Sequence, residues 1–170
     1  HSPSRRQRQM CIRDRYRVDY NFTFEAYINV RSSENFEGFL DFGNYDEGTN
    51  QSGFGAFLYS GGWRFYLRTE QSAFGDIQHV VASAPVDTWA HFAVTFGNGT
   101  LKLYRDGILV DSRGGYSGPV DWSGFSGDLT LGRFDYDEGQ YRYFDGLMDE
   151  VRFWNVTKSC LLYTSDAADD

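Results

Sequence analysis

Residues 89–110 read WAHFAVTFGNGTLKLYRDGILV, and this stretch decides the fold class. Apolar side chains take every second position at its start: Ala90, Phe92, Val94 and Phe96. This period of two is typical of a half-buried strand. Asn98-Gly99 and Asp106-Gly107 then divide the rest into two further apolar segments. Because both dipeptides tolerate the positive φ of a type I′ turn, the stretch predicts three antiparallel strands joined by tight turns.

Other parts of the chain carry the same kind of pattern. Residues 22–30 alternate over nine positions, and residues 57–59 and 63–67 form an expected hairpin across Gly61-Gly62. Further strands are expected at 39–42, 129–131 and 147–154, and no helical stripe is visible. Short strands at this spacing indicate an all-β sandwich or barrel.

Composition excludes several classes of protein. The chain has 170 residues, a formal charge of −8 and 18% aromatic residues, which suits one folded domain and not a disordered chain. No run of about 18 apolar residues is present, so no membrane-spanning helix is expected. The acidic balance argues against nucleic acid, because phosphates are bound by Lys and Arg. Cys11 and Cys160 are too few for a small disulfide scaffold or a zinc ribbon.

The two ends of the chain differ from its body. Residues 1–17 hold six Arg, and residues 160–170 read CLLYTSDAADD. Both resemble translated adapter sequence at the ends of proteins from assembled metagenomes, so we treat them as non-native tails. A solvated basic arm and acidic tail is the alternative. The expected domain, residues 18–159, holds 10 basic and 20 acidic residues and no cysteine. A cysteine-free domain fits an extracellular or a cytoplasmic protein equally well.

One carboxylate interrupts the last expected strand. Strict alternation places Asp149 on the same face as Leu147, Val151 and Phe153, which predicts that it faces the core. Such a carboxylate must be hydrogen-bonded, paired or metal-bound, and a hydrogen bond to a neighbouring loop is the preferred interpretation. Glu150 is expected to be a solvated surface charge.

Five strings, in this order and spacing, resemble laminin G-like jellyroll domains: FTFEAYI (22–28), WAHFAVT (89–95), LKLYRDG (101–107), LTLG (129–132) and FDGLMDEVRFWN (144–155). The resemblance covers about residues 20–157. It implies the concanavalin A-like lectin/glucanase fold, an antiparallel jellyroll β-sandwich of two sheets, on a ground plan that pentraxins share. It also implies structural roles for Trp89, Asp106, Gly107, Gly146 and Asp149. The opening strand and the closing segment of the family have no counterpart here, which implies truncation at both ends and an unpaired sheet edge.

The resemblance extends to enzymes, whose chemistry this sequence lacks. Related glucanases carry Glu-x-Asp-x-x-Glu on one strand, and this pattern is absent. Retaining glycosidases need two carboxyl groups about 5 Å apart on a fixed frame. His79 and His91 have no nucleophile in a recognisable motif, and His91 is expected to be a packed, hydrogen-bonded residue. We therefore expect no catalytic residue and no enzyme activity.

Two acidic loops are the candidate metal site. NYDEG at 44–48 and DYDEG at 135–139 are nearly the same string. Calcium takes six to eight oxygen ligands, and the resemblance to pentraxins implies a calcium site where these loops would meet. The candidate ligands are Asp46, Glu47, Asn50, Asp135, Asp137 and Glu138. Two separate solvated loops remain the alternative.

Aromatic residues accompany the two loops. A ring with a flat face and a polar tip can cover a sugar, and it can equally pack in the core or at its rim. The candidate ligand-binding residues are Tyr45, Tyr116, Trp122, Tyr136, Tyr141 and Tyr143.

The sequence therefore predicts a non-catalytic extracellular or cell-surface module of a larger protein. Its expected ligands are glycans or extracellular proteins, with calcium as the candidate cofactor. A structural or adhesion spacer is the alternative, and a glucanase-type hydrolase is a third interpretation.

Overall fold

The computed structural model describes residues 18–32, 34–44, 52–71, 78–125, 128–135 and 141–158. These residues form strands and turns, with no helix among them, and therefore no helix long and apolar enough to cross a membrane. The strands are β1 (Phe22–Val30), β2 (Gly38–Asn44), β3 (Ser52–Tyr59), β4 (Gly62–Leu67), β5 (Gln78–Ser83), β6 (Trp89–Gly97), β7 (Thr100–Arg105), β8 (Ile108–Gly114), β9 (Thr130–Leu131), β10 (Arg133–Asp135), β11 (Tyr141–Tyr143) and β12 (Gly146–Trp154).

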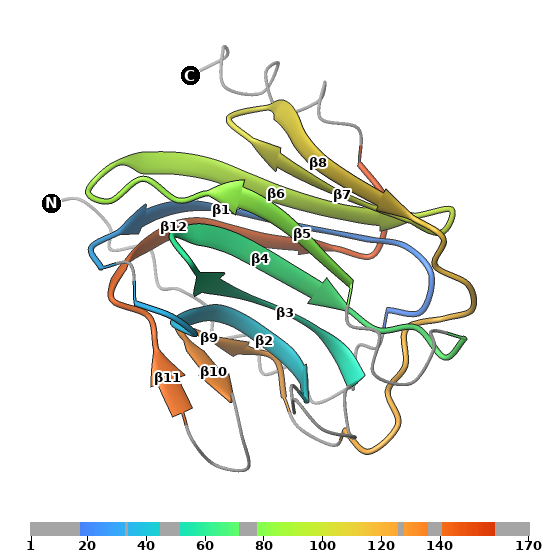
Figure 1. Cartoon of the computed structure of the whole chain (residues 1–170). Coiled ribbons are helices and arrows are strands. Elements are labelled where there is room, and N and C mark those ends of the chain that lie inside the picture. Colours follow the sequence, from blue (N-terminus) through green and yellow to red (C-terminus); the bar gives the residue numbers. More distant parts are fainter. Residues whose placement is uncertain are drawn as a thin grey trace, which may run out of the picture.

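The strands form two sheets that pack face to face as a sandwich (Figure 1). In the described residues, one sheet has the order β12-β1-β6-β7-β8, and the other has the order β10-β11-β2-β3-β4-β5, with β9 also paired to β2. All pairs are antiparallel except the contact of β11 with β2. The expected all-β fold, a sandwich of two mainly antiparallel sheets, is confirmed.

The predicted tight turns are present where local chemistry favours them. Asn98 and Gly99 have φ values of 49° and 67°, and Asp106 and Gly107 have φ values of 51° and 78°. These are the positive values that a type I′ hairpin turn requires. In the β3–β4 hairpin, the turn residues are Ser60 and Gly61, one position before the expected pair Gly61-Gly62. Tyr59 and Gly62 form the last pair of the two strands.

The core between the sheets consists largely of aromatic rings. Phe22 is fully buried and stacks on Phe54 across the sandwich, with ring centroids 4.6 Å apart. Phe153 of β12 lies 5.9 Å from Phe22 and 5.8 Å from Phe54. Ring pairs at such distances add to the hydrophobic stabilisation from burial. Alternate residues of β1, β3, β4 and β6 supply this layer, so period-two patterning and the packing agree.

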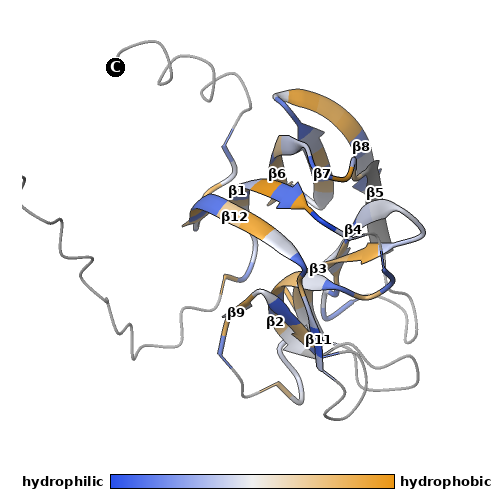
Figure 2. Ribbon diagram, turned by 90° about the vertical axis from the view of Figure 1, so that its left-hand side faces the viewer, coloured by the Kyte–Doolittle hydropathy of each residue, from blue (hydrophilic) through white to orange (hydrophobic). Residues whose placement is uncertain are grey.

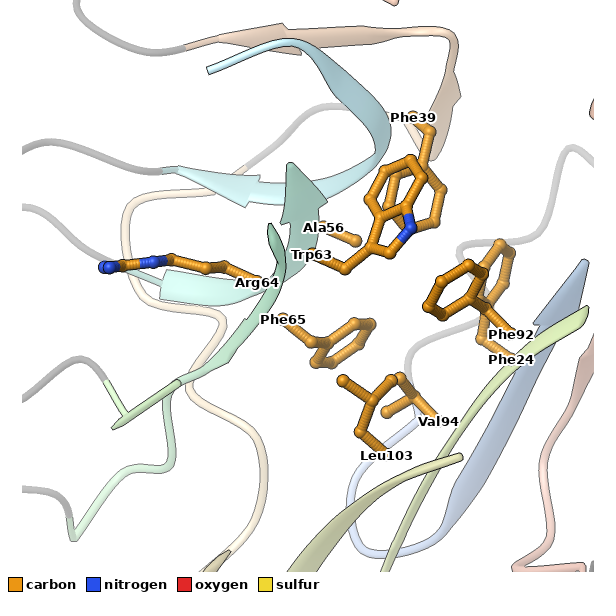
Figure 3. Close-up of a pocket in the computed structure, with 9 residues that line it drawn as sticks. All are labelled: Phe24, Phe39, Ala56, Trp63, Arg64, Phe65, Phe92, Val94 and Leu103. Atoms are coloured by element: carbon orange, nitrogen blue, oxygen red, sulfur yellow. The ribbon is translucent and has the colours of Figure 1, made fainter. Parts of the chain in front are cut away.

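A small void of about 10 Å³ lies inside this core (Figure 3). Its lining is Phe24, Phe39, Ala56, Trp63, Phe65, Phe92, Val94 and Leu103, together with Arg64, whose guanidinium points away from it (Figure 3). The volume is at most that of one water molecule, and the side chains that face it are apolar. It is therefore a packing gap and not a ligand site.

β12 forms one edge of its sheet in the described part of the chain (Figure 2). It pairs with β1 alone among these residues, and Leu147 and Val151 keep 42% and 36% of their surface exposed. Glu150 has a φ of 50°, and the register with β1 shifts between Glu25 and Tyr27. This β-bulge reverses the alternation along β12.

Candidate functional site

The strands that precede the two candidate loops are joined by a hydrogen bond. β2 ends at Asn44, before loop 45–51, and β10 ends at Asp135, before loop 136–140. The backbone N–H of Asp135 donates a hydrogen bond to Oδ2 of Asp41 on β2, at 3.2 Å. The start of the second loop is thus fixed to the strand that leads into the first.

Asp41 is the buried polar group at this junction. It is 7% exposed, and Tyr66 donates a hydrogen bond from its hydroxyl to Oδ1 at 3.2 Å. Burial raises the pKa of Asp41 from 3.8 to about 7, because desolvation disfavours the charged carboxylate more than these two hydrogen bonds favour it. The junction therefore holds a carboxyl that exchanges its proton near neutral pH.

One face of the β10–β11 hairpin is anchored by a buried ring, and the other face carries its two exposed tyrosines. Phe134 is fully buried and packs on Phe57 and Tyr66, with ring centroids 4.7 and 6.0 Å away, on the outer side of the sheet. Gly38 permits this approach, since a Cβ there would lie 1.9 Å from the Cβ of Phe134. Phe134 therefore anchors the hairpin and fixes which residues point outward.

The exposed face of this hairpin carries two tyrosines, an arginine and an aspartate. Arg133 pairs with Tyr143, and Asp135 pairs with Tyr141, so these four side chains share one face. We call them the tyrosine face. Tyr141 and Tyr143 are 45% and 67% exposed, and the Arg133 guanidinium lies 4.3 Å from the Tyr141 ring centroid. Rings, a cation and a carboxylate are thus combined next to both loops.

The structure describes only part of the candidate metal site. Asp135 ends β10, whereas the other five candidate ligands lie outside the described residues: Asp46, Glu47, Asn50, Asp137 and Glu138. Among the described residues, no three His, Cys, Asp or Glu side chains are grouped as metal ligands would be. The structure does show that the strand before the second loop is hydrogen-bonded to the strand before the first loop.

Two of the aromatic candidates belong to the core, which corrects the expectation that they cover a ligand. Tyr116 is 7% exposed and packs against Phe96, with centroids 5.5 Å apart. Trp122 is 8% exposed and packs 4.9 Å from Phe42. Burial also raises the pKa of the Tyr116 phenol. Tyr45 and Tyr136 lie outside the described residues. Among the candidates that the structure describes, Tyr141 and Tyr143 have surface available to a ligand.

The prediction that Asp149 faces the core is wrong. Asp149 is exposed, pairs with Tyr27 on the outer side of the sheet, and accepts a hydrogen bond from the Glu150 backbone at 2.8 Å. The bulge at Glu150 is the reason, because strict alternation ends there and Met148 takes the inward position. Glu150 itself is exposed, as expected, and pairs with Arg152.

Trp89, Asp106, Gly107 and Gly146 are the other residues that were expected to have structural roles, and Trp89 is too exposed for a role in packing. Trp89 begins β6 and is 47% exposed. Asp106 accepts a hydrogen bond from the His91 backbone at 2.9 Å in the turn with Gly107. Gly146 is needed for space, since a Cβ would lie 2.3 Å from the Asn29 carbonyl oxygen.

His91 is hydrogen-bonded, as the sequence predicts, but its partner was not foreseen. Its Nε2 lies 3.3 Å from Oε2 of Glu25, which is 1% exposed on the outer side of β1. Trp154 donates a hydrogen bond from its indole to Oε1 of Glu25 at 3.3 Å. The side chain of His79 lies outside the described residues.

Sequence reasoning missed Asp41 and Arg133. Asp41 interrupts the apolar run Phe39-Leu40-Asp41-Phe42, and a carboxylate in such a run was the available signal. Arg133 directly follows the LTLG string, but its contact with Tyr141 depends on a hairpin that no local pattern indicated.

Comparison with known proteins agrees with this architecture. The family model described as the concanavalin A-like lectin/glucanases superfamily matches residues 7–159, a range that includes part of the expected N-terminal tail. No curated protein matches the chain.

Solved structures share the fold at low identity. A proposed carbohydrate-binding protein from Bacteroides ovatus has a TM-score of 0.61 and 22% identity over 83% of this chain and 39% of its own. The receptor-binding domain of botulinum neurotoxin mosaic serotype C/D has a TM-score of 0.59 and 12% identity, over 85% and 36%. A heptameric pentraxin from Limulus polyphemus has a TM-score of 0.55 and 12% identity, over 91% and 77%. The chain thus spans less than two fifths of the first two structures. With the family match over most of its length, the chain belongs to the laminin G-like group of the concanavalin A-like lectin/glucanase superfamily.

Proposed function

We propose that this domain is a non-catalytic binding module whose ligand surface is the tyrosine face together with loops 45–51 and 136–140. The observation that carries the proposal is the pair of exposed tyrosines, 45% and 67% exposed, on a hairpin anchored by buried Phe134. Rigid, amphipathic rings bind a ligand at little cost in conformational entropy. The fixed frame beneath them keeps this cost low.

The preferred ligand is a carbohydrate. A pyranose presents an apolar face to a ring and hydroxyl groups at its rim, and Arg133 and Asp135 supply a donor and an acceptor beside the rings. The similarity to a proposed carbohydrate-binding protein of Bacteroides ovatus supports this choice. A protein ligand is the alternative within the same function, and the receptor-binding domain of the neurotoxin is similar in fold.

Calcium is the proposed cofactor of this surface. The hydrogen bond from Asp135 to Asp41 brings the two loop origins together, and the loops contain five further oxygen-bearing candidate ligands. That many carboxylates would repel one another without a cation. An extracellular module of this kind binds calcium weakly, with a Kd on the order of 10⁻⁴–10⁻³ M. We also propose that the module works outside the cell or on its surface, as part of a larger protein.

A glycan array with and without EDTA tests the proposal. We expect binding in millimolar calcium that EDTA weakens. The double variant Tyr141→Ala/Tyr143→Ala should lose about tenfold in affinity, since two ring contacts contribute about 1–2 kcal/mol together. Tyr20→Ala is the matched control, because Tyr20 is 60% exposed and lies before β1, outside the tyrosine face. Absence of glycan binding would contradict the carbohydrate ligand, and equal loss in both variants would place glycan binding away from the tyrosine face.

A further inference from the structure

A second exposed aromatic surface lies on the other sheet, on its outer side. Asn29 of β1 pairs with both Leu147 of β12 and Trp89 of β6. Tyr27, two residues earlier, pairs with Asp149 and His91 on the same two strands. Paired residues, and residues two apart on a strand, point to one side of a sheet. Three strands thus bring these six residues together on one side.

The large side chains of this surface are open to solvent. Trp89, Tyr27 and Leu147 are 47%, 43% and 42% exposed. We call the surface formed by these three residues the Trp89 face. Exposed Trp and Tyr that lie beside an aliphatic residue are typical of interaction hot spots.

The strand and the side chain that support the Trp89 face are held in place by buried contacts. Ala26 and Ile28 of β1 are buried in the core, so the strand that carries Tyr27 cannot rotate. His91 lies 4.9 Å from the Tyr27 ring and is itself bonded to buried Glu25 at 3.3 Å. A preorganised surface loses little entropy when a partner binds.

The charge around the Trp89 face is predominantly negative. Asp149 pairs with Tyr27, Asp145 accepts a hydrogen bond from the Arg31 backbone at 2.9 Å, and Asp87 donates its own backbone N–H to Val30 at 2.7 Å. All three aspartates are exposed or half-exposed, and none forms an ion pair with another residue in the described ranges. With Arg31, these three aspartates give a net charge of about −2. Arg152, on the same side of the sheet beyond Tyr27, is already paired with Glu25 and Glu150.

Elsewhere in the described residues, a cation of the same chain lies over one face of an aromatic ring in three places. Arg64 lies 4.1 Å from the Tyr59 ring, Arg133 lies 4.3 Å from Tyr141, and Lys158 lies 3.1 Å from Trp154. Within the described residues no such cation lies over Trp89 or Tyr27. Exposed rings with carboxylates beside them attract a cation from outside.

We propose that the Trp89 face docks a basic protein segment, with an Arg or Lys side chain over the Trp89 ring, paired to Asp87 or Asp149, and an apolar side chain against Leu147. The charge favours such a partner by complementarity, which sets specificity and speeds association. The surface is separate from the tyrosine face, which lies on the other sheet, so the two can bind different ligands.

Binding of a synthetic peptide, four repeats of Arg-Leu-Ser, to the wild-type protein tests this proposal by calorimetric titration. We expect saturable binding that 0.5 M NaCl weakens, while the peptide with Glu in place of Arg does not bind. Trp89→Ala should weaken binding about threefold to fivefold, as expected for one exposed cation–π contact. Asp149→Asn should weaken it about twofold to threefold.

Three further variants keep the test decisive. Glu70→Gln removes one exposed carboxylate beyond β4 of the other sheet, and it should leave the affinity within about twofold. Trp89→Phe retains a ring and should bind better than Trp89→Ala. Tyr141→Ala/Tyr143→Ala should leave peptide binding unchanged, so failure of the glycan proposal would not affect this result.

Equal binding of the Glu peptide, or the same affinity in Trp89→Ala and Glu70→Gln, would overturn the proposal. Binding of neutral maltoheptaose that is lost in Trp89→Ala would also overturn it, because it would assign the face to a glycan.

Discussion

Replacing Asp41 by asparagine should remove a large pH dependence of the free energy of unfolding. Asp41 is buried, and desolvation raises its pKa from 3.8 to about 7 in the folded state. In the unfolded chain the same carboxyl ionises near pH 4. Its stabilising contribution is therefore fully present below pH 4 and is lost as the pH rises through 7.

The size of this effect follows from the shift. A difference of about three pH units corresponds to about 4 kcal/mol of unfolding free energy between pH 4 and pH 8. For a domain of this length, 1 kcal/mol moves the midpoint of thermal unfolding by about 2–4 °C, so the contribution is worth about 8–16 °C. The amide of the Asp41→Asn variant has no proton to lose in this pH range. The substitution also alters the hydrogen bonds with Asp135 and Tyr66, but this changes the free energy of unfolding of the variant by the same amount at every pH.

Calorimetry of wild type and Asp41→Asn, from pH 4 to pH 8 in EDTA, measures this contribution. Other carboxylates also titrate, so the quantity to follow is the difference in midpoint between variant and wild type at each pH. We expect this difference to move in favour of the variant as the pH rises. Asp128→Asn, which removes one carboxylate at an exposed site, is the matched control. A flat difference for Asp41→Asn would refute the reasoning, because it would show that the carboxyl is solvated in the folded protein.

Three further predictions concern the tails, catalysis and calcium. Deleting residues 1–17 and 160–170 should leave the thermal midpoint almost unchanged, whereas a loss of several degrees would show that the tails are structural. Purified protein should release no sugar from β-glucans, and hydrolysis that disappears in Asp137→Ala would show that a loop carboxylate had been recruited as an acid or base. Millimolar calcium should raise the melting temperature of the wild type but not of Asp135→Ala/Asp137→Ala; equal stabilisation of both proteins would place any calcium elsewhere.

The fold was predictable where it depends on local chemistry. Asn98-Gly99 and Asp106-Gly107 specify their turns because these residues accept a positive φ, and residues 22–30 specify a strand by alternation. β10 and β11 were not predicted, because strands of three residues are too short to show a period. β5 was not predicted either, although it pairs with β4 over six positions.

The candidate site was only partly predictable, because side-chain direction depends on packing across the molecule. One bulge at Glu150 turns Asp149 outward, and a sequence pattern assumes that the period continues. Tyr116 and Trp122 have the composition of a binding surface, yet Phe96 and Phe42 enclose them from other strands. Asp41 is close to Asp135 although 94 positions separate them in sequence.

The central claim, a ligand surface on the β10–β11 hairpin, is tested most directly by NMR. The measurement is a ¹H–¹⁵N titration of the domain, in millimolar calcium, with the strongest glycan from the array. We expect the largest chemical-shift changes on the amides of residues 133–135 and 141–143. Largest changes at Tyr27, Trp89 and Leu147, or on β8 at the far edge of the other sheet, would contradict it.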